Sequence, residues 1–148
     1  MFGCLLRYSL RSGPWLAAGL VSLACASPAH ADPCEGALPA PGAVFSGAVR
    51  YVGDGDGLCL GPAGRPEHWV EVRLGDFFAP ELQEPGGAQA KARLEQLVLG
   101  RVLVCKARRR SYDRVIGFCT LAGKPVGDLL RARGGREAGR GWQARPSR

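Results

Sequence analysis

Five short strand-like segments and two helical segments predict a mainly β domain, a five-stranded barrel of the OB type. The strand-like segments are rich in β-branched and aromatic residues, and clusters of Gly, Pro and Asp separate them. One amphipathic helix is inserted between the third and fourth strands, and a short helix follows the fifth. Strands at this spacing with one inserted helix are typical of a small Greek-key barrel.

The first 31 residues have the organisation of a cleavable signal peptide. Arg7 and Arg11 precede an apolar run at 15–26, and Ala29-His30-Ala31 fits an A-x-A cleavage site. A membrane-spanning helix needs roughly 20 apolar residues, so an uncleaved anchor is the weaker alternative. We therefore expect export to the periplasm or the medium, a mature chain that begins at Asp32, and no stable membrane association.

The predicted elements of the mature chain follow a lead-in at 32–43 that is rich in Pro, Ala and Gly. The domain itself is expected at 44–133, and an arginine-rich tail at 134–148 is expected to be flexible. Turns are expected at 53–57 and 61–66, and a basic loop at 108–110. The expected strands cover 44–52, 58–60, 68–78, 102–105 and 114–121, and the expected helices cover 88–99 and 126–133.

Two of these elements show a clear apolar face. In the strand at 68–78, alternation places Val70, Val72 and Leu74 in the core and Trp69, Glu71 and Arg73 on the other face. The helix at 88–99 carries an apolar stripe, which consists of Ala90, Leu94, Leu97 and Val98.

Four cysteines remain in the predicted mature chain, and an exported protein folds in an oxidising compartment. Four cysteines can pair in three ways, and buried free thiols are the alternative. The strands at 102–105 and 114–121 would form a hairpin that brings Cys105 and Cys119 together. We therefore expect a Cys105–Cys119 bridge, with Cys34–Cys59 as the second.

The balance of charge is compatible with a polyanionic ligand. Removing Arg7 and Arg11 from the 20 Lys and Arg residues leaves 18 basic residues against 13 acidic ones. Such a balance favours nucleic acid as a partner, although many exported proteins are basic without this role. His68 is the only histidine of the mature chain, and the sequence has neither a P-loop nor a calcium-binding EF-hand.

Acidic and arginine residues near the expected strand ends could carry chemistry. Asp54 and Asp56 flank the first turn, Arg73 lies on the third strand, Glu81 follows it and Arg114 begins the fifth. Carboxylates can hold a divalent cation or accept a proton from water, and arginines can neutralise a phosphate. Without further evidence, turn residues and solvated surface charges would explain the same pattern.

Four segments in order resemble the staphylococcal nuclease-like family, whose members include the thermonucleases. They are GDGD (53–56), VRLGDFFAPE (72–81), GGAQAKARLEQLVLG (86–100) and SYDRVIGFCTLAGKPVGDLL (111–130). The resemblance covers about Phe45 to Arg133. It implies an OB-fold barrel with helices and a calcium-dependent phosphodiesterase that cuts DNA or RNA with water as the nucleophile. We therefore expect an exported nuclease that acts as a monomer.

The resemblance also assigns roles to individual residues. Arg73 and Arg114 match the arginines that grip the scissile phosphate, and Glu81 matches the glutamate near the attacking water. Asp56 matches a metal-binding aspartate, and Ala79 matches the position that lends its backbone carbonyl to the metal. Asp54, which precedes them, matches an acidic neighbour of the site.

One departure from the family pattern affects the metal. Phe78 stands where the family has its second metal-binding aspartate, and Gly57 replaces a usual hydroxyl residue. Calcium takes six to eight oxygen ligands, and even loss of an outer-shell partner costs about 10–100-fold in metal affinity or activity. Asp76 lies on the same strand face, but about 7 Å away along the strand. We therefore expect a weakened calcium site.

Two alternatives to a nuclease remain at this point. Phe78, the basic segment 108–110 and the arginine-rich tail fit a non-catalytic module that binds single-stranded nucleic acid or another polyanion. Such binding requires a charged groove with stacking aromatic residues. The candidates for stacking are Tyr51, Trp69, Phe77, Phe78 and Tyr112. A purely structural or protein-binding domain is the third alternative.

Overall fold

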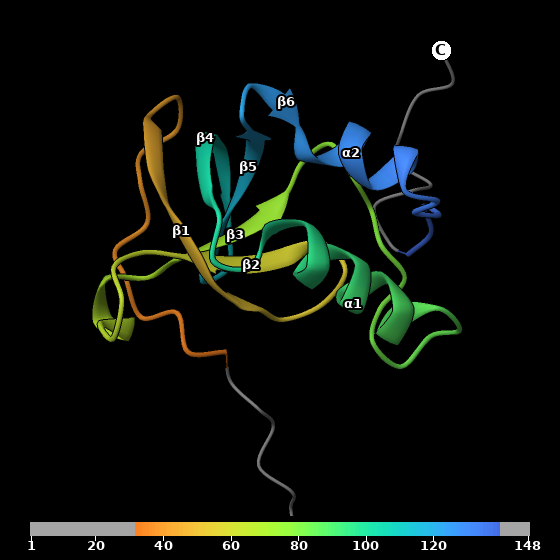
Figure 1. Cartoon of the computed structure of the whole chain (residues 1–148). Helices are drawn as coiled ribbons and strands as arrows, with labels where there is room; N and C mark the ends of the chain where they lie inside the picture. The colour runs from red at the N-terminus through yellow and green to blue at the C-terminus, as the bar shows by residue number, and fades with distance from the viewer. Residues whose placement is uncertain (1–31, 140–148) are drawn as a thin grey trace, which may run out of the picture. The chain divides into compact units, whose positions relative to one another are not determined.

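The computed structural model describes residues 32–139, in which six strands form one sheet and two helices pack against it (Figure 1). The predicted signal peptide lies outside these residues. The strands are β1 (Val44–Val52), β2 (Gly57–Leu60), β3 (Val70–Leu74), β4 (Val102–Ser111), β5 (Arg114–Leu121) and β6 (Lys124–Pro125). The helices are α1 (Gly87–Val98) and α2 (Val126–Ala132), and a 3₁₀ turn covers Pro66–His68.

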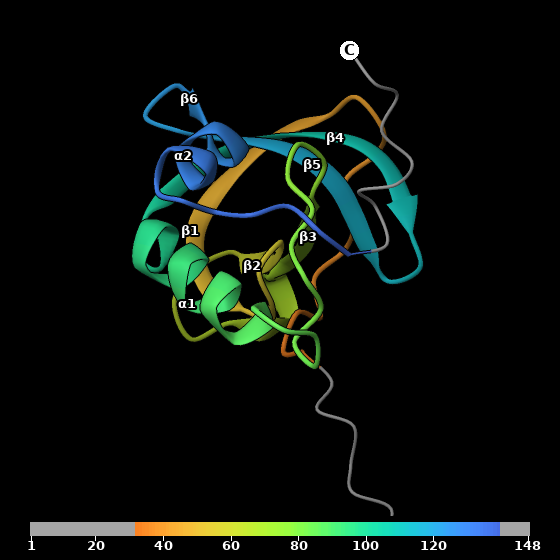
Figure 2. The ribbon, with the colours of Figure 1, turned by 90° about the vertical axis from the view of Figure 1, so that its right-hand side faces the viewer.

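The strands are ordered β3-β2-β1-β4-β5-β6, and neighbours in this order are antiparallel. A further, parallel pairing joins β3 to β5, with Val72 opposite Val115. Each strand from β1 to β5 therefore has a partner on both sides. Figure 2 shows the strong bend of β1, β4 and β5 that accompanies this arrangement. The mainly β class predicted from the sequence is confirmed.

The core lies between the sheet and the helices. The apolar stripe of α1 is buried as predicted, with Leu94 and Val98 fully inaccessible to solvent. From the sheet, alternate residues of β3 and β4 point inward, among them Val72, Leu74 and Leu103. Burial of this apolar surface is the main favourable contribution to the stability of the fold.

The third strand is shorter than predicted, and one of its charged residues is buried. The 3₁₀ turn takes up Pro66–His68, and β3 ends at Leu74. Gly75 N still bonds to Gly117 O of β5, and the Asp76 carboxylate then accepts a hydrogen bond from Gly127 N, 3.1 Å away at the start of α2. Glu71, expected on the charged face of the strand, is only 9% exposed.

The predicted basic loop at 108–110 belongs to β4. Pairing with β5 continues past a bulge between Ala107 and Arg109 to Ser111 opposite Arg114. The true turn is Tyr112-Asp113, where Tyr112 has a φ of 60°. The expected loop is wrong because pairing with β5 keeps the three consecutive arginines in an extended strand, although their charge alone favours a loop.

Both predicted disulfides are present, Cys34–Cys59 and Cys105–Cys119. Cys105 and Cys119 are direct partners in the β4–β5 ladder, and Cys34 ties the lead-in to β2. Disulfides of this kind are typical of proteins that fold in an oxidising compartment. Within residues 32–139, no helix is long and apolar enough to cross a membrane.

Residues 134–139 are the first part of the tail that the sequence predicts to be flexible. This segment returns along the body of the domain, and Ala138 N donates a 2.8 Å hydrogen bond to the carbonyl oxygen of Phe78. Figure 2 shows the blue segment after α2 crossing toward the chain that follows β3. The rest of the predicted tail, 140–148, lies outside the described residues.

Candidate functional site

The site is organised around the buried carboxylate of Asp56, which lies just before β2. Its Oδ2 atom accepts one hydrogen bond from Arg73 Nη2 and one from Ala79 N, both at 3.1 Å. The turn before it is closed by Asp54, whose Oδ1 atom accepts a 3.0 Å hydrogen bond from Asp56 N. Gly55 is required in this turn, because a Cβ atom there would lie 2.4 Å from the Ala79 Cβ.

The environment of Asp56 disfavours its charged form. Burial, followed by the nearby Asp54 carboxylate, raises the pKa of Asp56 to about 7, although Arg73 and Ala79 N act in the opposite direction. The residue is 1% exposed. Its raised pKa weakens the attraction of the site for a cation, because part of the favourable charge of Asp56 is offset by the cost of burying it.

Glu81 completes this cluster from the segment after β3. Its Oε1 atom lies 3.9 Å from Arg73 Nη2, and its side chain is 32% exposed. Arg73 therefore lies between a buried carboxylate and an accessible one. The structure brings together Asp56, Arg73, Ala79 and Glu81, as the resemblance implies.

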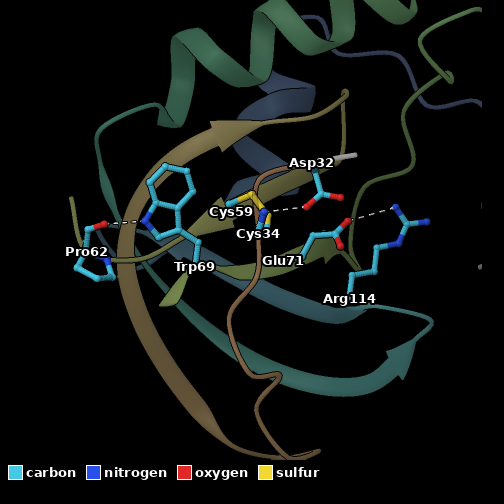
Figure 3. Close-up of a disulfide and its surroundings, with 7 residues drawn as sticks. All are labelled: Asp32, Cys34, Cys59, Pro62, Trp69, Glu71 and Arg114. Carbon is cyan, nitrogen blue, oxygen red and sulfur yellow. Dashed lines mark hydrogen bonds and ion pairs between the residues drawn. A yellow bond between two sulfur atoms is a disulfide. The ribbon is translucent and has the colours of Figure 1, made fainter. Parts of the chain in front are cut away.

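Arg114 pairs with a carboxylate that sequence reasoning missed. Its Nη1 atom lies 3.9 Å from Glu71 Oε1 (Figure 3). Burial, followed by the charges of Asp32 and Asp113, raises the pKa of Glu71 to about 7, while Arg114 lowers it. Strand alternation was the available signal, because residues two apart on β3 share a face and Glu71 therefore lies on the side of Arg73.

Phe78 lines a pocket of about 500 Å³ beside this cluster. Basic side chains from β3 and β4 and a second aromatic ring from β5 surround the same cavity. The guanidinium of Arg108 lies 5.2 Å from the centre of the Phe118 ring, within the range of a cation–π contact. The lining residues are Gly42, Arg73, Leu74, Gly75, Phe78, Lys106, Ala107, Arg108, Arg109, Ile116 and Phe118.

The aromatic residues proposed for stacking have different surroundings. Phe77 is 2% exposed and belongs to the core. Tyr112 is 96% exposed at the β4–β5 turn, and Trp69 Nε1 donates a 2.6 Å hydrogen bond to Pro62 O beside the Cys34–Cys59 bridge (Figure 3). Of the five candidates only Phe78 lines the pocket, and Phe118, which also lines it, was missed.

The oxygen atoms around Asp56 do not fit a calcium ion in this arrangement. The Phe78 side chain supplies no oxygen, its backbone carbonyl accepts a hydrogen bond from Ala138 N, and Ala79 turns its N–H toward Asp56. A Cβ atom added to Gly139 would lie 2.4 Å from the Ala79 carbonyl oxygen, so the C-terminal segment covers that atom. The Asp76 carboxylate is engaged with Gly127 at the start of α2. Calcium takes six to eight oxygen ligands, and in this arrangement the Phe78 side chain, the Ala79 carbonyl and the Asp76 carboxylate add none to the carboxylates of Asp54, Asp56 and Glu81.

A second group of potential ligand atoms does not form a metal site either. Asp32, Cys34 and Cys59 present their ligand atoms within 4.8 Å of one another. The two cysteines are joined in a disulfide, whereas metal coordination requires a thiolate. In addition, Asp32 Oδ1 accepts a 3.0 Å hydrogen bond from Cys34 N, so the group closes a local turn.

Fold and site together define a disulfide-linked, mainly β domain with a basic, aromatic pocket next to a buried carboxylate–arginine pair. No protein-family model matches the chain, and no curated protein is significantly similar to it. Membership of the nuclease-like family therefore stays a prediction that rests on the four quoted segments.

Proposed function

We propose that this protein binds single-stranded nucleic acid, with a base against Phe78 and backbone phosphates on the surrounding basic side chains. The observation that carries this proposal is the pocket itself. It combines the exposed part of an aromatic ring with four cationic residues, which are Arg73, Lys106, Arg108 and Arg109. Proteins that bind single strands without sequence preference use this combination of stacking and charge.

The size and chemistry of the pocket support this ligand class. A volume of about 500 Å³ lies within the roughly 300–1,000 Å³ of ordinary small-ligand sites, which accommodate a nucleotide. In a nucleotide the base offers an apolar face to Phe78 and Phe118, and the backbone phosphate matches the guanidinium groups of Arg73 and Arg109. Contacts of this kind carry little sequence information, so we expect weak base preference.

The strand pairings support a five-stranded barrel of the OB type for this domain. The pairing of β3 with β5 joins the two ends of the β3-β2-β1-β4-β5 series. In OB folds one face of the barrel binds oligonucleotides. The pocket opens between β3, β4 and β5, which would place it on such a face. We also propose export, which the two disulfides support.

Hydrolysis of phosphodiester bonds is the second candidate function, and the Asp56–Arg73–Glu81 cluster favours it. A phosphate held by Arg73 would lie close to Glu81, whose exposed carboxylate could accept a proton from water. The nuclease-like resemblance implies calcium for this reaction. Because the oxygen set around Asp56 does not fit calcium as arranged, we place hydrolysis second.

The test measures binding of a fluorescent single-stranded oligonucleotide by anisotropy, using the mature chain without divalent metal. Phe78→Ala removes the ring, and Arg109→Ala removes one pocket charge. Arg101→Ala is the matched control, because Arg101 is exposed and lies outside the pocket. Stacking of a base is worth about 1–3 kcal/mol. We therefore expect Phe78→Ala to bind at least about 5-fold more weakly and Arg101→Ala to bind nearly as well as the parent.

A gel assay on the same oligonucleotide separates the two candidates. If the oligonucleotide stays intact with calcium, with magnesium and with chelator, and the parent binds it in the anisotropy assay as expected, the binding module is supported. Metal-dependent cutting that Glu81→Gln abolishes would establish the nuclease instead. If the parent does not bind the strand at low salt, both functions fail.

A further inference from the structure

One face of the sheet exposes aliphatic side chains to solvent. Val44, Val102 and Val104 are 67%, 60% and 48% exposed. They lie on the same side of the sheet, because residues opposite each other on paired strands, or two apart on one strand, point to one side. We call this surface the valine face. Its members are Val44, Ser46 and Ala48 of β1, Val102 and Val104 of β4, and Thr120 of β5.

The valine face adjoins the basic pocket but differs from it in chemistry. Lys106 lies opposite Val44 on one side and Phe118 on the other, and both Lys106 and Phe118 line the pocket. The valine face itself holds no aromatic residue, so it has no ring on which a base could stack. Its aliphatic surface therefore favours a different partner from the one proposed for the pocket.

The strands that form the valine face carry basic residues and no acidic ones. A second copy of the chain on this face would bring like charges together. The same applies to residues 140–148, which hold three arginines and no acid. Because juxtaposed like charges disfavour an interface, we expect an anionic partner. The basic residues of the three strands are Arg50, Lys106, Arg108, Arg109, Arg110 and Arg114.

We propose that the valine face binds the surface of an anionic lipid bilayer. An exposed apolar patch with a polar rim marks an interaction site for a protein or a membrane. Peripheral binding to a bilayer strengthens with the apolar area that is buried and with the attraction of basic residues to anionic headgroups. The valine face combines both contributions, and a lipid surface matches both its aliphatic side chains and its charge.

The contact is peripheral and reversible. The three valines reach the boundary between the headgroups and the lipid chains, and Lys106 and Arg108 lie beside the headgroup phosphates. Such a contact is much weaker than a membrane-spanning helix, so it is compatible with the expected absence of stable membrane association. It does not depend on nucleic-acid binding by the pocket, because the three valines do not line that pocket.

A pair of valine substitutions tests the face without altering the pocket. The double variant Val102→Thr, Val104→Thr replaces two exposed apolar side chains by polar ones of similar size that also suit a strand. Leu82→Thr is the matched control, because Leu82 is also exposed, at 41%, but lies in the segment after β3 next to Glu81. Urea unfolding checks that both variants are folded.

The measurement is co-sedimentation of the mature chain with lipid vesicles. One set of vesicles contains equal parts of phosphatidylglycerol and phosphatidylcholine, and the other contains phosphatidylcholine alone. We expect the parent to bind the anionic vesicles at least about 10-fold more tightly, and added salt to weaken this binding. The double variant should bind the anionic vesicles about 5-fold more weakly or less, because two valines no longer favour burial. Leu82→Thr should bind them as the parent does.

Four results would overturn the proposal. They are failure of the parent to bind anionic vesicles, equal binding to both kinds of vesicle, equal binding by the parent and the double variant, and a dimer of the parent that the double variant abolishes. The oligonucleotide assay on the same proteins distinguishes this proposal from the proposed function. The double variant should bind the oligonucleotide like the parent. If it loses oligonucleotide binding and keeps vesicle binding, the valine face belongs to the nucleic-acid site instead.

Discussion

The guanidinium of Arg73 reaches from β3 to the carboxylate of Asp56, with 3.1 Å between Nη2 and Oδ2. Asp56 is almost completely buried, and the same oxygen also accepts the N–H of Ala79. The pair therefore connects the turn before β2 with the segment after β3. That segment carries Phe78 into the pocket and Glu81 to the accessible side of Arg73.

Removing Asp56 should destabilise the fold as well as the site. Asp56→Ala removes the acceptor that the buried Ala79 N–H and the Arg73 guanidinium share. The Arg73 side chain is 15% exposed. Breaking such a pair from one side typically costs about 3 kcal/mol or more. Urea unfolding at neutral pH measures the loss, with Glu35→Ala at an exposed position of the lead-in as the control. A cost no larger than that of the control would show that Asp56 contributes little to the fold.

Adjacent phenylalanines should separate stability from binding. Phe77→Ala empties a core position and should cost about 3–5 kcal/mol in free energy of unfolding. Phe78→Ala should cost at most about half of that, because its ring is only half-buried in the pocket, yet it should weaken oligonucleotide binding. Unfolding and anisotropy on the two variants test this difference. The reverse pattern would mean that Phe78 is a structural residue.

The raised pKa of Glu71 predicts a specific pH dependence of stability. Its pKa is about 7 in the folded state against an ordinary 4.5, so between these values the folded state binds more protons than the unfolded state. Glu71 therefore does not lower the free energy of unfolding below pH 4.5. It lowers this free energy by its full amount above about pH 7. For this shift of the pKa, the loss of stability is on the order of 3 kcal/mol.

Glu71→Gln removes this titration. The variant should match the parent near pH 4.5 and become progressively more stable than the parent up to about pH 7, as followed by urea unfolding across that range. The difference in free energy of unfolding between the two proteins reports the titration of Glu71 alone. Asp56, whose pKa is also raised, contributes equally to both. Glu35→Gln, at an exposed position of the lead-in, should show no such trend. A constant difference across the range would contradict the assignment.

The Cys34–Cys59 bridge should contribute substantially to stability. It closes a loop with a sequence separation of 25 residues, for which the chain-entropy model gives about 3 kcal/mol. The Cys34→Ser, Cys59→Ala double variant should lose this amount in thermal or urea unfolding and should expose the lead-in to limited proteolysis. A loss below about 1 kcal/mol would mean that backbone hydrogen bonds alone hold the lead-in.

Local patterns predicted much of the fold. The alternation of Val70, Val72 and Leu74 and the stripe of α1 identified buried faces, because burial of one face imposes a period on the sequence. The hairpin that pairs Cys105 with Cys119 followed from two strand-like segments. The extension of β4 through Arg108–Arg110 could not be predicted in this way, because strand pairing with β5 decides it.

The site was predictable in part. The segments that resemble the nuclease-like family place Asp56, Arg73, Ala79 and Glu81 together, as the structure does. The pairing of Arg114 with Glu71 and the contribution of Phe118 to the pocket depend on which strands are neighbours. The returning segment 134–139 had no signal, because glycine-rich and charged sequence resembles a solvated tail.

The salt dependence of oligonucleotide binding directly tests whether the basic pocket binds the phosphates of a single strand. For single strands, log K falls by about 0.7 per neutralised phosphate for each unit of log salt. The pocket holds four basic side chains, which corresponds to a slope of about −2 to −3. We expect a slope in this range that becomes shallower by about 0.7 in Arg109→Ala and not in Arg101→Ala. Binding that does not depend on salt, or a slope that Arg101→Ala alone reduces, would contradict it.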